Sequence, residues 1–197
     1  MKIYFARHGQ YQNPDGVIPY QLPGFPLTEL GKQQAKLQGD KLLSEKIRSL
    51  SCSPIERCVE TATIIGQTIH LHPNSYPELT ETLTPLQGLT KAELSKLSEN
   101  YPYDVQTHID GGGESPEAIF ERMTNYINKL KGMSKNSTHV IVSHGDPIMI
   151  YLSGTLLKTI PHVDAEFYES KIRYIPMGGL VMLDYSQSGI PKYSEII

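Results

Sequence analysis

The sequence has no apolar run of membrane-spanning length, few cysteines and no excess of positive charge. Because no apolar leader with a cleavage site opens the chain and no segment could span a bilayer, we expect a cytoplasmic protein without a membrane partner. The formal net charge is −3, and basic residues do not alternate with aromatic ones, so we expect no nucleic-acid partner. Any anion that binds must therefore be held by a local group of cations.

The two cysteines do not indicate a metal site. Cys52 and Cys58 are six residues apart, a spacing that matches no metal-binding motif, and we interpret them as buried, reduced thiols. No other group of residues has metal-ligand spacing, so no metal and no cofactor are expected. The run Gly111-Gly112-Gly113 is not followed by Lys-Ser/Thr, so it is not a phosphate-binding P-loop.

What the sequence does contain is the composition of an ordinary globular domain. Its 197 residues are 39% hydrophobic and 20% charged, which is enough to bury a sizeable core. No internal repeat, low-complexity tract or linker divides the chain. We therefore predict a single domain over residues 1–197, with an irregular insert at about 80–114 that lies over the functional site.

Three predicted strands each run directly into a segment that carries Arg or His. The pairs are Ile3–Ala6 before Arg7-His8-Gly9, Arg48–Cys52 before Ser53-Pro54-Ile55-Glu56-Arg57, and Thr138–Val142 before Ser143-His144-Gly145-Asp146-Pro147. Ligands of open α/β sheets bind outside the carboxyl ends of the strands, so these segments are candidate site residues. Guanidinium and imidazole groups hold or attack phosphoryl groups, which indicates a phosphoryl-transfer enzyme.

Capping residues mark the expected helix starts. The predicted helices are Glu29–Glu45 after the N-cap Thr28, Pro54–Ile69 after the N-cap Ser53, one opened by Ser115 and Pro116, and one opened by Asp146 and Pro147 that ends near Leu157. In the second of these, Ser53 and Glu56 have the spacing of a capping box.

Apolar spacing predicts the buried faces of the first three helices. The expected core residues are Leu30, Leu37 and Leu42 in the first, Ile55, Val59, Ala62, Ile65 and Ile69 in the second, and Ile119, Met123, Tyr126, Ile127 and Leu130 in the third. Arg57 lies off the predicted face, in a first turn where a cation opposes the helix dipole by about 0.3–1 kcal/mol. Such a local conflict is typical of a functional site, and suits an arginine that shares an anion with the free N–H groups.

The remaining segments are shorter or irregular. They are the loop Tyr11–Pro26, a short strand and then a loop in Pro73–Gly88, a short helix in Lys91–Glu99, the irregular stretch Tyr101–Gly113, and late strands in Gly178–Tyr185 and Pro191–Ile197. The order of these elements predicts an α/β fold in three layers, with a mostly parallel central sheet and helices on both faces.

Four side chains at the strand ends have the chemistry that phosphoryl transfer requires. Neutral imidazole is a good nucleophile near neutral pH, so His8 could accept the phosphoryl group if a neighbour, such as a backbone carbonyl, held its other nitrogen. Arg7 and Arg57 match the three equatorial oxygens of the transferring group. His144 could stabilise the same oxygens as a donor.

A departing alkoxide needs a proton from a general acid. Glu78 and Glu81 both lie in a segment expected to overhang the strand ends, and spacing alone does not choose between them. Each could instead be a solvated loop carboxylate. In the same way, Arg57 could form a surface ion pair with Glu56 or Glu60.

Four motifs occur in order within residues 2–150. They are Arg7-His8-Gly9, Leu27-Thr28-Glu29-Leu30-Gly31 with Gln34-Ala35, Ser53-Pro54-Ile55-Glu56-Arg57-Cys58-Val59-Glu60-Thr61-Ala62, and Ser143-His144-Gly145. Together they resemble the histidine phosphatase superfamily, in the branch that includes cofactor-dependent phosphoglycerate mutases and many small-molecule phosphatases. The resemblance implies that His8 becomes a phosphohistidine and that Glu81, in preference to Glu78, is the proton donor.

The resemblance also implies which residues hold the substrate and which take part in catalysis. The implied substrate contacts are Arg7, Gly9, Gln10, Asn13, Arg57, His144 and Gly145, and the implied catalytic residues are His8, Glu81, His144, Arg7 and Arg57. The common Arg-His-Gly-Glu-Thr opening reads Gln10-Tyr11 in its last two positions here, and the usual asparagine is displaced to Asn13.

One departure from the mutases concerns the choice between hydrolysis and isomerisation. Thr82-Leu83-Thr84 follows Glu81 where the mutases carry Arg and aromatic residues, and the chain has no adjacent Arg pair. A reorienting diphosphorylated intermediate would lack those cations. We therefore predict a metal-independent hydrolase of small phosphomonoesters. A phosphomutase is the first alternative, and an inactive domain that binds phosphorylated ligands is the second.

Overall fold

The computed structural model describes residues 1–96, 105–133, 136–160 and 172–197, and its described strands form one six-stranded sheet. The strands are β1 (Lys2–Arg7), β2 (Ile47–Cys52), β3 (Pro73–Ser75), β4 (Thr138–Ser143), β5 (Leu180–Asp184) and β6 (Lys192–Glu195). They lie in the order β3-β2-β4-β1-β5-β6. Neighbours from β3 to β1 are parallel, whereas β5 is antiparallel to both β1 and β6. The prediction of a mostly parallel sheet is confirmed.

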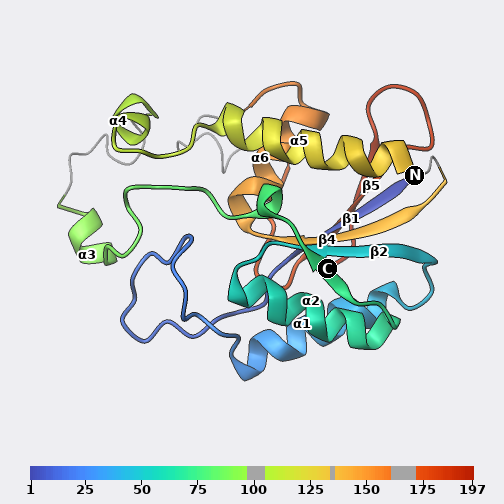
Figure 1. Ribbon diagram of the computed structural model, residues 1–197, viewed down its shortest axis with the longest axis horizontal. Coiled ribbons are helices and arrows are strands. Elements are labelled where there is room, and N and C mark those ends of the chain that lie inside the picture. The colour runs from blue at the N-terminus through green and yellow to red at the C-terminus, as the bar shows by residue number, and fades with distance from the viewer. Residues whose placement is uncertain (97–104, 134–135, 161–171) are drawn as a thin grey trace.

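Helices cover both faces of this sheet, as Figure 1 shows. The helical elements are α1 (Glu29–Leu42), α2 (Glu56–Ile69), the 3-10 turn η1 (Pro77–Leu79), α3 (Lys91–Leu94), α4 (Val105–Asp110), α5 (Pro116–Met133) and α6 (Gly145–Leu156). α1 and α2 pack together on one face, and α5 and α6 on the other. The predicted three-layer α/β architecture is confirmed.

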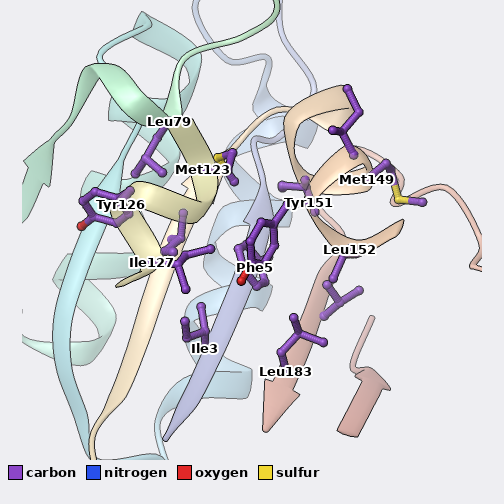
Figure 2. Close-up of a cluster of buried hydrophobic side chains, with 14 of the residues drawn as sticks. Ile3, Phe5, Leu79, Met123, Tyr126, Ile127, Met149, Tyr151, Leu152 and Leu183 are labelled. Carbon is purple, nitrogen blue, oxygen red and sulfur yellow. The ribbon is translucent and has the colours of Figure 1, made fainter. Parts of the chain in front are cut away.

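Side-chain alternation along β1 divides the core into two halves. Ile3 and Phe5 belong to the cluster beneath α5 and α6, whereas Tyr4 and Ala6 belong to the cluster beneath α1 and α2. Figure 2 shows the first cluster, where Phe5 lies beside side chains of both covering helices. Since both faces are covered by apolar side chains, the sheet is held rigidly, and the groups at the ends of its strands are well positioned.

The core-facing side of α1 differs from the prediction. Leu42 is fully buried, but Leu30 and Leu37 are 50% and 47% exposed. The residues that α1 buries are Gly31, Ala35, Gln38, Gly39 and Leu42. A Cβ atom on Gly39 would lie only 2.8 Å from the Thr68 side chain of α2. Leucine spacing predicts the wrong stripe because small residues, which let the two helices approach closely, face the sheet and α2.

This difference predicts unequal effects for two Leu→Ala substitutions in the same helix. We expect Leu42→Ala to lower the free energy of unfolding by about 2–5 kcal/mol, because it leaves a cavity in the core. Leu37→Ala is the matched control, with an expected change within about 0.5 kcal/mol at an exposed site. Urea denaturation with unchanged m-values measures both quantities. Equal losses for the two variants would contradict the observed orientation of α1.

Two of the predicted N-caps make the hydrogen bonds expected of them. The hydroxyl of Thr28 accepts from the N–H of Gly31 at 3.0 Å, at the start of α1. The hydroxyl of Ser115 accepts from the N–H of Ala118 at 3.1 Å, at the start of α5. All five side chains predicted to form the core face of α5 are buried. These two helix starts are therefore confirmed.

The predicted start of α2 is wrong by two residues. The helix begins at Glu56 with Ile55 as its N-cap, and this cap makes no side-chain hydrogen bond. Ser53 accepts instead from the N–H of Ile55 at 3.2 Å, so it forms no capping box with Glu56. The predicted face is also wrong in part, because Ile55, Val59 and Ile69 are only partly buried. The helix turns its more polar side inward at its start, toward the site described below.

The start of α6 and part of the insert also differ from the predictions. α6 begins at Gly145 with His144 as its N-cap, so the predicted cap Asp146 lies inside its first turn. α4 is helical within a stretch that was expected to be irregular. The short elements β3 and α3 and the late strands β5 and β6 occur where predicted, whereas the 3-10 turn η1 lies in a segment that was expected to be a loop. The expected end of α3 at Glu99 lies outside the described residues.

Cys52 and Cys58 are buried and form no disulfide, as predicted. No helix in the described ranges is long and apolar enough to cross a membrane.

Candidate active site

The sheet register brings the segments that follow β1, β2 and β4 to one edge of the sheet. Arg7 of β1 pairs with Ser143 of β4, and Cys52 of β2 pairs with Val142 of the same strand. The N–H of His8 donates to the carbonyl of Ser143 at 3.1 Å, which extends the pairing one residue beyond β1. Because β2, β4 and β1 are parallel neighbours, the residues that follow them are gathered at the same edge.

His8 is held as a neutral imidazole whose Nε2 carries the unprotonated lone pair. Its Nδ1 donates to the carbonyl of Gly9 at 2.8 Å, and its Nε2 accepts from Nε of Arg57 at 3.2 Å, which assigns the tautomer. Burial, and then the positive charge of Arg57, hold the pKa of His8 well below its usual value. The ring is 2% exposed. Its Nε2 therefore has the character of a nucleophile that is ready to react near neutral pH.

The backbone next to His8 is fixed by α2 and by close packing. The N–H of Gly9 donates to the hydroxyl of Thr61 at 3.1 Å, and that hydroxyl donates to the carbonyl of Arg57 at 2.7 Å. A Cβ atom on Gly9 would collide with the carbonyl oxygen of Gly31 in α1. Glycine is required at this position by the close approach of two backbones, which sets the direction of the His8 ring.

Arg57 lies at the centre of the site and is only 1% exposed. The prediction that it lies off the buried face of α2 is therefore wrong. Its Nη2 donates to the carbonyl of Tyr20 at 2.6 Å and to Nδ1 of His144 at 3.0 Å. The ring of Tyr11 lies against the guanidinium, 5.3 Å from its Cζ. Contacts with Tyr20, His144 and Tyr11 therefore fix the plane of the Arg57 guanidinium.

Arg7 approaches the same region from the other side. Its Nη1 donates to the carbonyl of Ile175 at 2.9 Å, and the Tyr174 ring lies 5.2 Å from its Cζ. The hydroxyl of Tyr174 donates to Asp146 at 2.7 Å. A Cβ atom on Gly145 would collide with the Tyr174 hydroxyl and lie 3.0 Å from Cζ of Arg7. Each of the two arginines is thus backed by a tyrosine ring.

His144 completes the group of four strand-end side chains. Its Nε2 donates to the hydroxyl of Ser53 at 2.8 Å, and its Nδ1 accepts from Arg57. Its ring centroid lies 5.2 Å from that of His8 in an edge arrangement. Burial, followed by the nearby charge of Arg57, keeps the pKa of His144 well below its usual value. Ser53 therefore orients a site histidine, although the sequence suggests it as a helix cap.

The two candidate acids lie in different surroundings. Glu78 forms an ion pair with Lys129 at 2.6 Å, and this lysine is largely exposed. Glu81 is buried, with its Oε2 3.6 Å from Nδ1 of His144. Burial and the neighbouring Asp146 raise the pKa of Glu81 to about 7, against the opposing charge of Arg57. Of the two carboxyl groups, only Glu81 has the place and the pKa of a proton donor.

Two arginine N–H groups lack a hydrogen-bond partner among the described residues. They are Nε of Arg7 and Nη1 of Arg57, and both atoms are buried. An unpaired buried donor costs about 1–3 kcal/mol, and more when it is charged. An anion placed between the two guanidinium groups would satisfy both donors and lie next to Nε2 of His8. The arrangement can therefore hold a phosphoryl group against a nucleophile.

Gln10 and Asn13, two further predicted substrate contacts, form hydrogen bonds with residues of the chain itself. The side-chain oxygen of Gln10 accepts from the hydroxyl of Thr28 at 2.8 Å. The amide of Asn13 bonds with both backbone groups of Val17, at 2.8 and 3.2 Å. The structure thus brings His8, Arg7, Arg57, His144 and Glu81 together, while contacts of Gln10 and Asn13 with a substrate stay predictions.

Sequence reasoning missed four side chains that position the site: Ser53 in this role, Thr61, Tyr11 and Tyr174. Thr61 follows Arg57 by one helical turn, so a polar residue on the buried side of α2 was a usable signal. Tyr11 and Tyr174 contact arginines that are distant in the sequence, and no local pattern marks these tyrosines. Among the described residues, no group of three or more His, Cys, Asp or Glu is placed to hold a metal ion.

Comparison with known proteins gives sequence relatives that cover most of the chain. Phosphoglycerate mutase-like protein 4 of Arabidopsis thaliana is 32% identical over 156 residues, which are 75% of this chain and 67% of that protein. Phosphoserine phosphatase 1 of Hydrogenobacter thermophilus is 28% identical over 158 residues, which are 75% and 72% of the two chains.

A solved structure and a family model agree with these sequence relatives. The mycobacterial glucosyl-3-phosphoglycerate phosphatase has a similar structure, with a TM-score of 0.80 at 22% identity, over 100% of this chain and 97% of that one. A family model for the histidine phosphatase superfamily (branch 1) matches residues 3–170. The chain therefore belongs to the histidine phosphatase superfamily.

Proposed function

We propose that this chain hydrolyses small phosphomonoesters through a phosphohistidine on His8 and needs no metal ion. The observation that carries the proposal is the neutral, buried His8, whose Nε2 faces Arg57 beside two arginine donors without partners in the described structure. The relatives are named a phosphatase and a phosphoglycerate mutase-like protein, names that stand for two outcomes of the same phosphoryl transfer.

In the first step, Nε2 of His8 attacks phosphorus in line with the ester bond. The N–P bond forms while the P–O bond breaks, and the departing oxygen takes the proton of Glu81. Arg7 and Arg57 neutralise the charge that spreads over the three equatorial oxygens. His144 accepts from Arg57 at Nδ1 and so helps to hold the Arg57 guanidinium in place.

In the second step, water attacks the phosphorus of phospho-His8. The carboxylate of Glu81 accepts a proton from this water, the N–P bond breaks, and its electron pair returns to Nε2 of the imidazole. Orthophosphate leaves, and both His8 and protonated Glu81 are regenerated. Across the two steps, His8, Glu81, the substrate and one water account for every proton and electron pair.

Hydrolysis is favoured over isomerisation by the residues that follow the acid. Thr82, Leu83 and Thr84 are uncharged, and Leu83 is 42% exposed. A mutase must retain an anionic, diphosphorylated intermediate while it reorients, and these side chains supply no charge to retain it. Incubation with 3-phosphoglycerate distinguishes the two outcomes, since a hydrolase releases orthophosphate whereas a mutase produces the 2-isomer.

Turnover of p-nitrophenyl phosphate, with and without a chelator, tests the proposal. We expect steady release of orthophosphate at a rate that the chelator leaves unchanged. Loss of the activity on chelation would contradict the metal-independent mechanism. Binding of orthophosphate without any turnover would support an inactive phosphate-binding domain instead.

The pKa of Glu81 predicts the pH dependence of hydrolysis. A proton donor acts only in its protonated form, and the raised pKa keeps Glu81 protonated up to about pH 7. For an alkyl phosphate, kcat/KM should therefore be highest below pH 7 and fall by about tenfold per unit above it. Glu81→Gln should remove this alkaline decline, whereas Glu78→Gln, at the exposed ion pair with Lys129, should preserve it. An unchanged profile in Glu81→Gln would exclude Glu81 as the donor.

A further inference from the structure

We infer that Arg122 of α5 is a positioning residue, which holds the segment around Glu81 so that the carboxyl group reaches the departing oxygen. The inference rests on the proposed function and concerns how its proton donor is held. Arg122 itself lies outside the group formed by His8, Arg7, Arg57 and His144.

The chain just before Glu81 is held through backbone carbonyls. Nη1 of Arg122 donates to the carbonyl of Glu78 at 2.7 Å. The hydroxyl of Ser143, at the end of β4, donates to the next carbonyl, that of Leu79, at 2.8 Å. Both donors come from elements anchored in the core, since α5 is buried along one side and β4 is buried from His139 to Ser143. The backbone just before Glu81 is therefore fixed to two elements of the core.

The chain just after Glu81 is held by the same arginine through Glu114. Nε and Nη2 of Arg122 donate to the two carboxylate oxygens of Glu114, at 2.6 and 3.0 Å. The N–H of Glu114 donates to the carbonyl of Leu83 at 2.8 Å, and the Leu83 N–H lies 3.5 Å from the Glu114 carboxylate. Arg122 therefore bridges both ends of the short segment that carries Glu81.

The planar guanidinium is what makes this bridge possible. It gives three donors in a fixed fork, one for the Glu78 carbonyl and two for the Glu114 carboxylate, whereas a lysine is a flexible point charge. Arg122 and Glu114 are each only 17% exposed, so the pair is better shielded from water than a surface ion pair. The carbonyl of Glu81 itself accepts from the side chain of Gln21, in the loop after β1, at 2.6 Å.

A positioned proton donor matters only when the leaving group needs a proton. An alkyl phosphate releases an alkoxide, which depends on the acid, but p-nitrophenyl phosphate releases a stable phenolate, which does not. Displacement of a catalytic group by about 1 Å can cost about 10²-fold in rate. Hydrolysis of the phosphoenzyme uses Glu81 with either substrate, but kcat/KM reports only the steps up to formation of the phosphoenzyme. A shift of Glu81 should therefore lower kcat/KM for the alkyl phosphate and spare kcat/KM for p-nitrophenyl phosphate.

Arg122→Lys tests the inference, because it keeps the charge and removes the fork. We expect kcat/KM for an alkyl phosphate to fall by about 10- to 100-fold and kcat/KM for p-nitrophenyl phosphate to change by less than about threefold. Lys129→Gln is the matched control on the same helix, since this lysine contacts the Glu78 side chain and not its carbonyl. It should leave both substrates unaffected.

A double-mutant cycle with Glu81→Gln completes the test. If Arg122 acts through Glu81, Arg122→Lys should have no further effect on the alkyl phosphate once Glu81 is replaced. Equal losses of kcat/KM on both substrates, or additive losses of kcat/KM in the double mutant, would overturn the inference and indicate general structural support. Failure of the unmodified protein to hydrolyse p-nitrophenyl phosphate would overturn the proposed function itself, which is a separate result.

Discussion

Replacement of His8 by alanine is expected to lower kcat by about 10⁴- to 10⁶-fold, the loss usually found when a covalent nucleophile is removed. The effect should be similar for alkyl and aryl phosphates, because no substrate can form the phosphoenzyme without Nε2. The two arginines remain in place, so orthophosphate should still bind. Steady-state release of orthophosphate, measured together with phosphate binding, checks both parts of the expectation.

A surface histidine provides the control for this variant. His72 is exposed on the segment between α2 and β3, and His72→Ala should retain the activity of the unmodified protein. Thermal unfolding of the His8→Ala variant shows whether the loss has a structural cause. Full activity in a folded His8→Ala variant would exclude the proposed mechanism.

Replacement of Arg57 is expected to have the next largest effect. Arg57→Ala should lower kcat by about 10³- to 10⁵-fold, as when an arginine that stabilises a transferring phosphoryl group is lost. Arg57→Lys should still lose about 10²- to 10³-fold, because an ammonium group cannot contact the His8 nitrogen, the Tyr20 carbonyl and His144 from one plane. The kcat values of both variants with p-nitrophenyl phosphate check this order.

The loss of activity in Arg57→Ala should also depend on pH. Arg57 contributes to the lowered pKa of His8 and of His144, so its removal should raise both pKa values. Protonation of His8 removes the nucleophile, and the remaining activity of Arg57→Ala should therefore disappear at a higher pH than that of the unmodified protein when the pH is lowered. Arg48→Ala, at an exposed position of β2, is the control and should change neither kcat nor the profile.

Local sequence signals were sufficient for the sheet and for most of the site. Arg7-His8-Gly9 and Ser143-His144-Gly145 each follow a short apolar strand, and parallel pairing places such ends side by side. This is why the two histidines, 136 positions apart in sequence, could be expected to lie together and have ring centroids 5.2 Å apart. The choice of Glu81 over Glu78 depended on the family resemblance, and the structure supplies its physical reason in burial.

Errors occurred where tertiary contacts outweigh local patterns. The spacing of apolar residues in α2 directs Arg57 away from the core, yet the site needs this cation buried beside His8 and His144. Ser53 has every local mark of a helix cap, but its hydroxyl is used by the His144 ring. Both exceptions lie at the candidate active site, and local rules are commonly broken at functional sites.

Contacts between distant segments had no signal in the sequence. Arg122 lies in an ordinary amphipathic helix, and its contacts with Glu78 and Glu114 depend on how the segments before and after Glu81 pack against α5. The Tyr174 ring reaches Arg7 across most of the chain, and Tyr11 reaches Arg57 from a loop. Each contact joins residues that only the complete fold brings together.

The most direct test of the account is to trap the phosphoenzyme. The protein is mixed with a substrate that carries a labelled phosphoryl group and quenched in base within the first turnovers, and the label is mapped after proteolysis. The account predicts one base-stable, acid-labile label, on the peptide that contains His8, and no label in the His8→Ala variant. Rapid turnover without any label, or a label on a different residue, would contradict it.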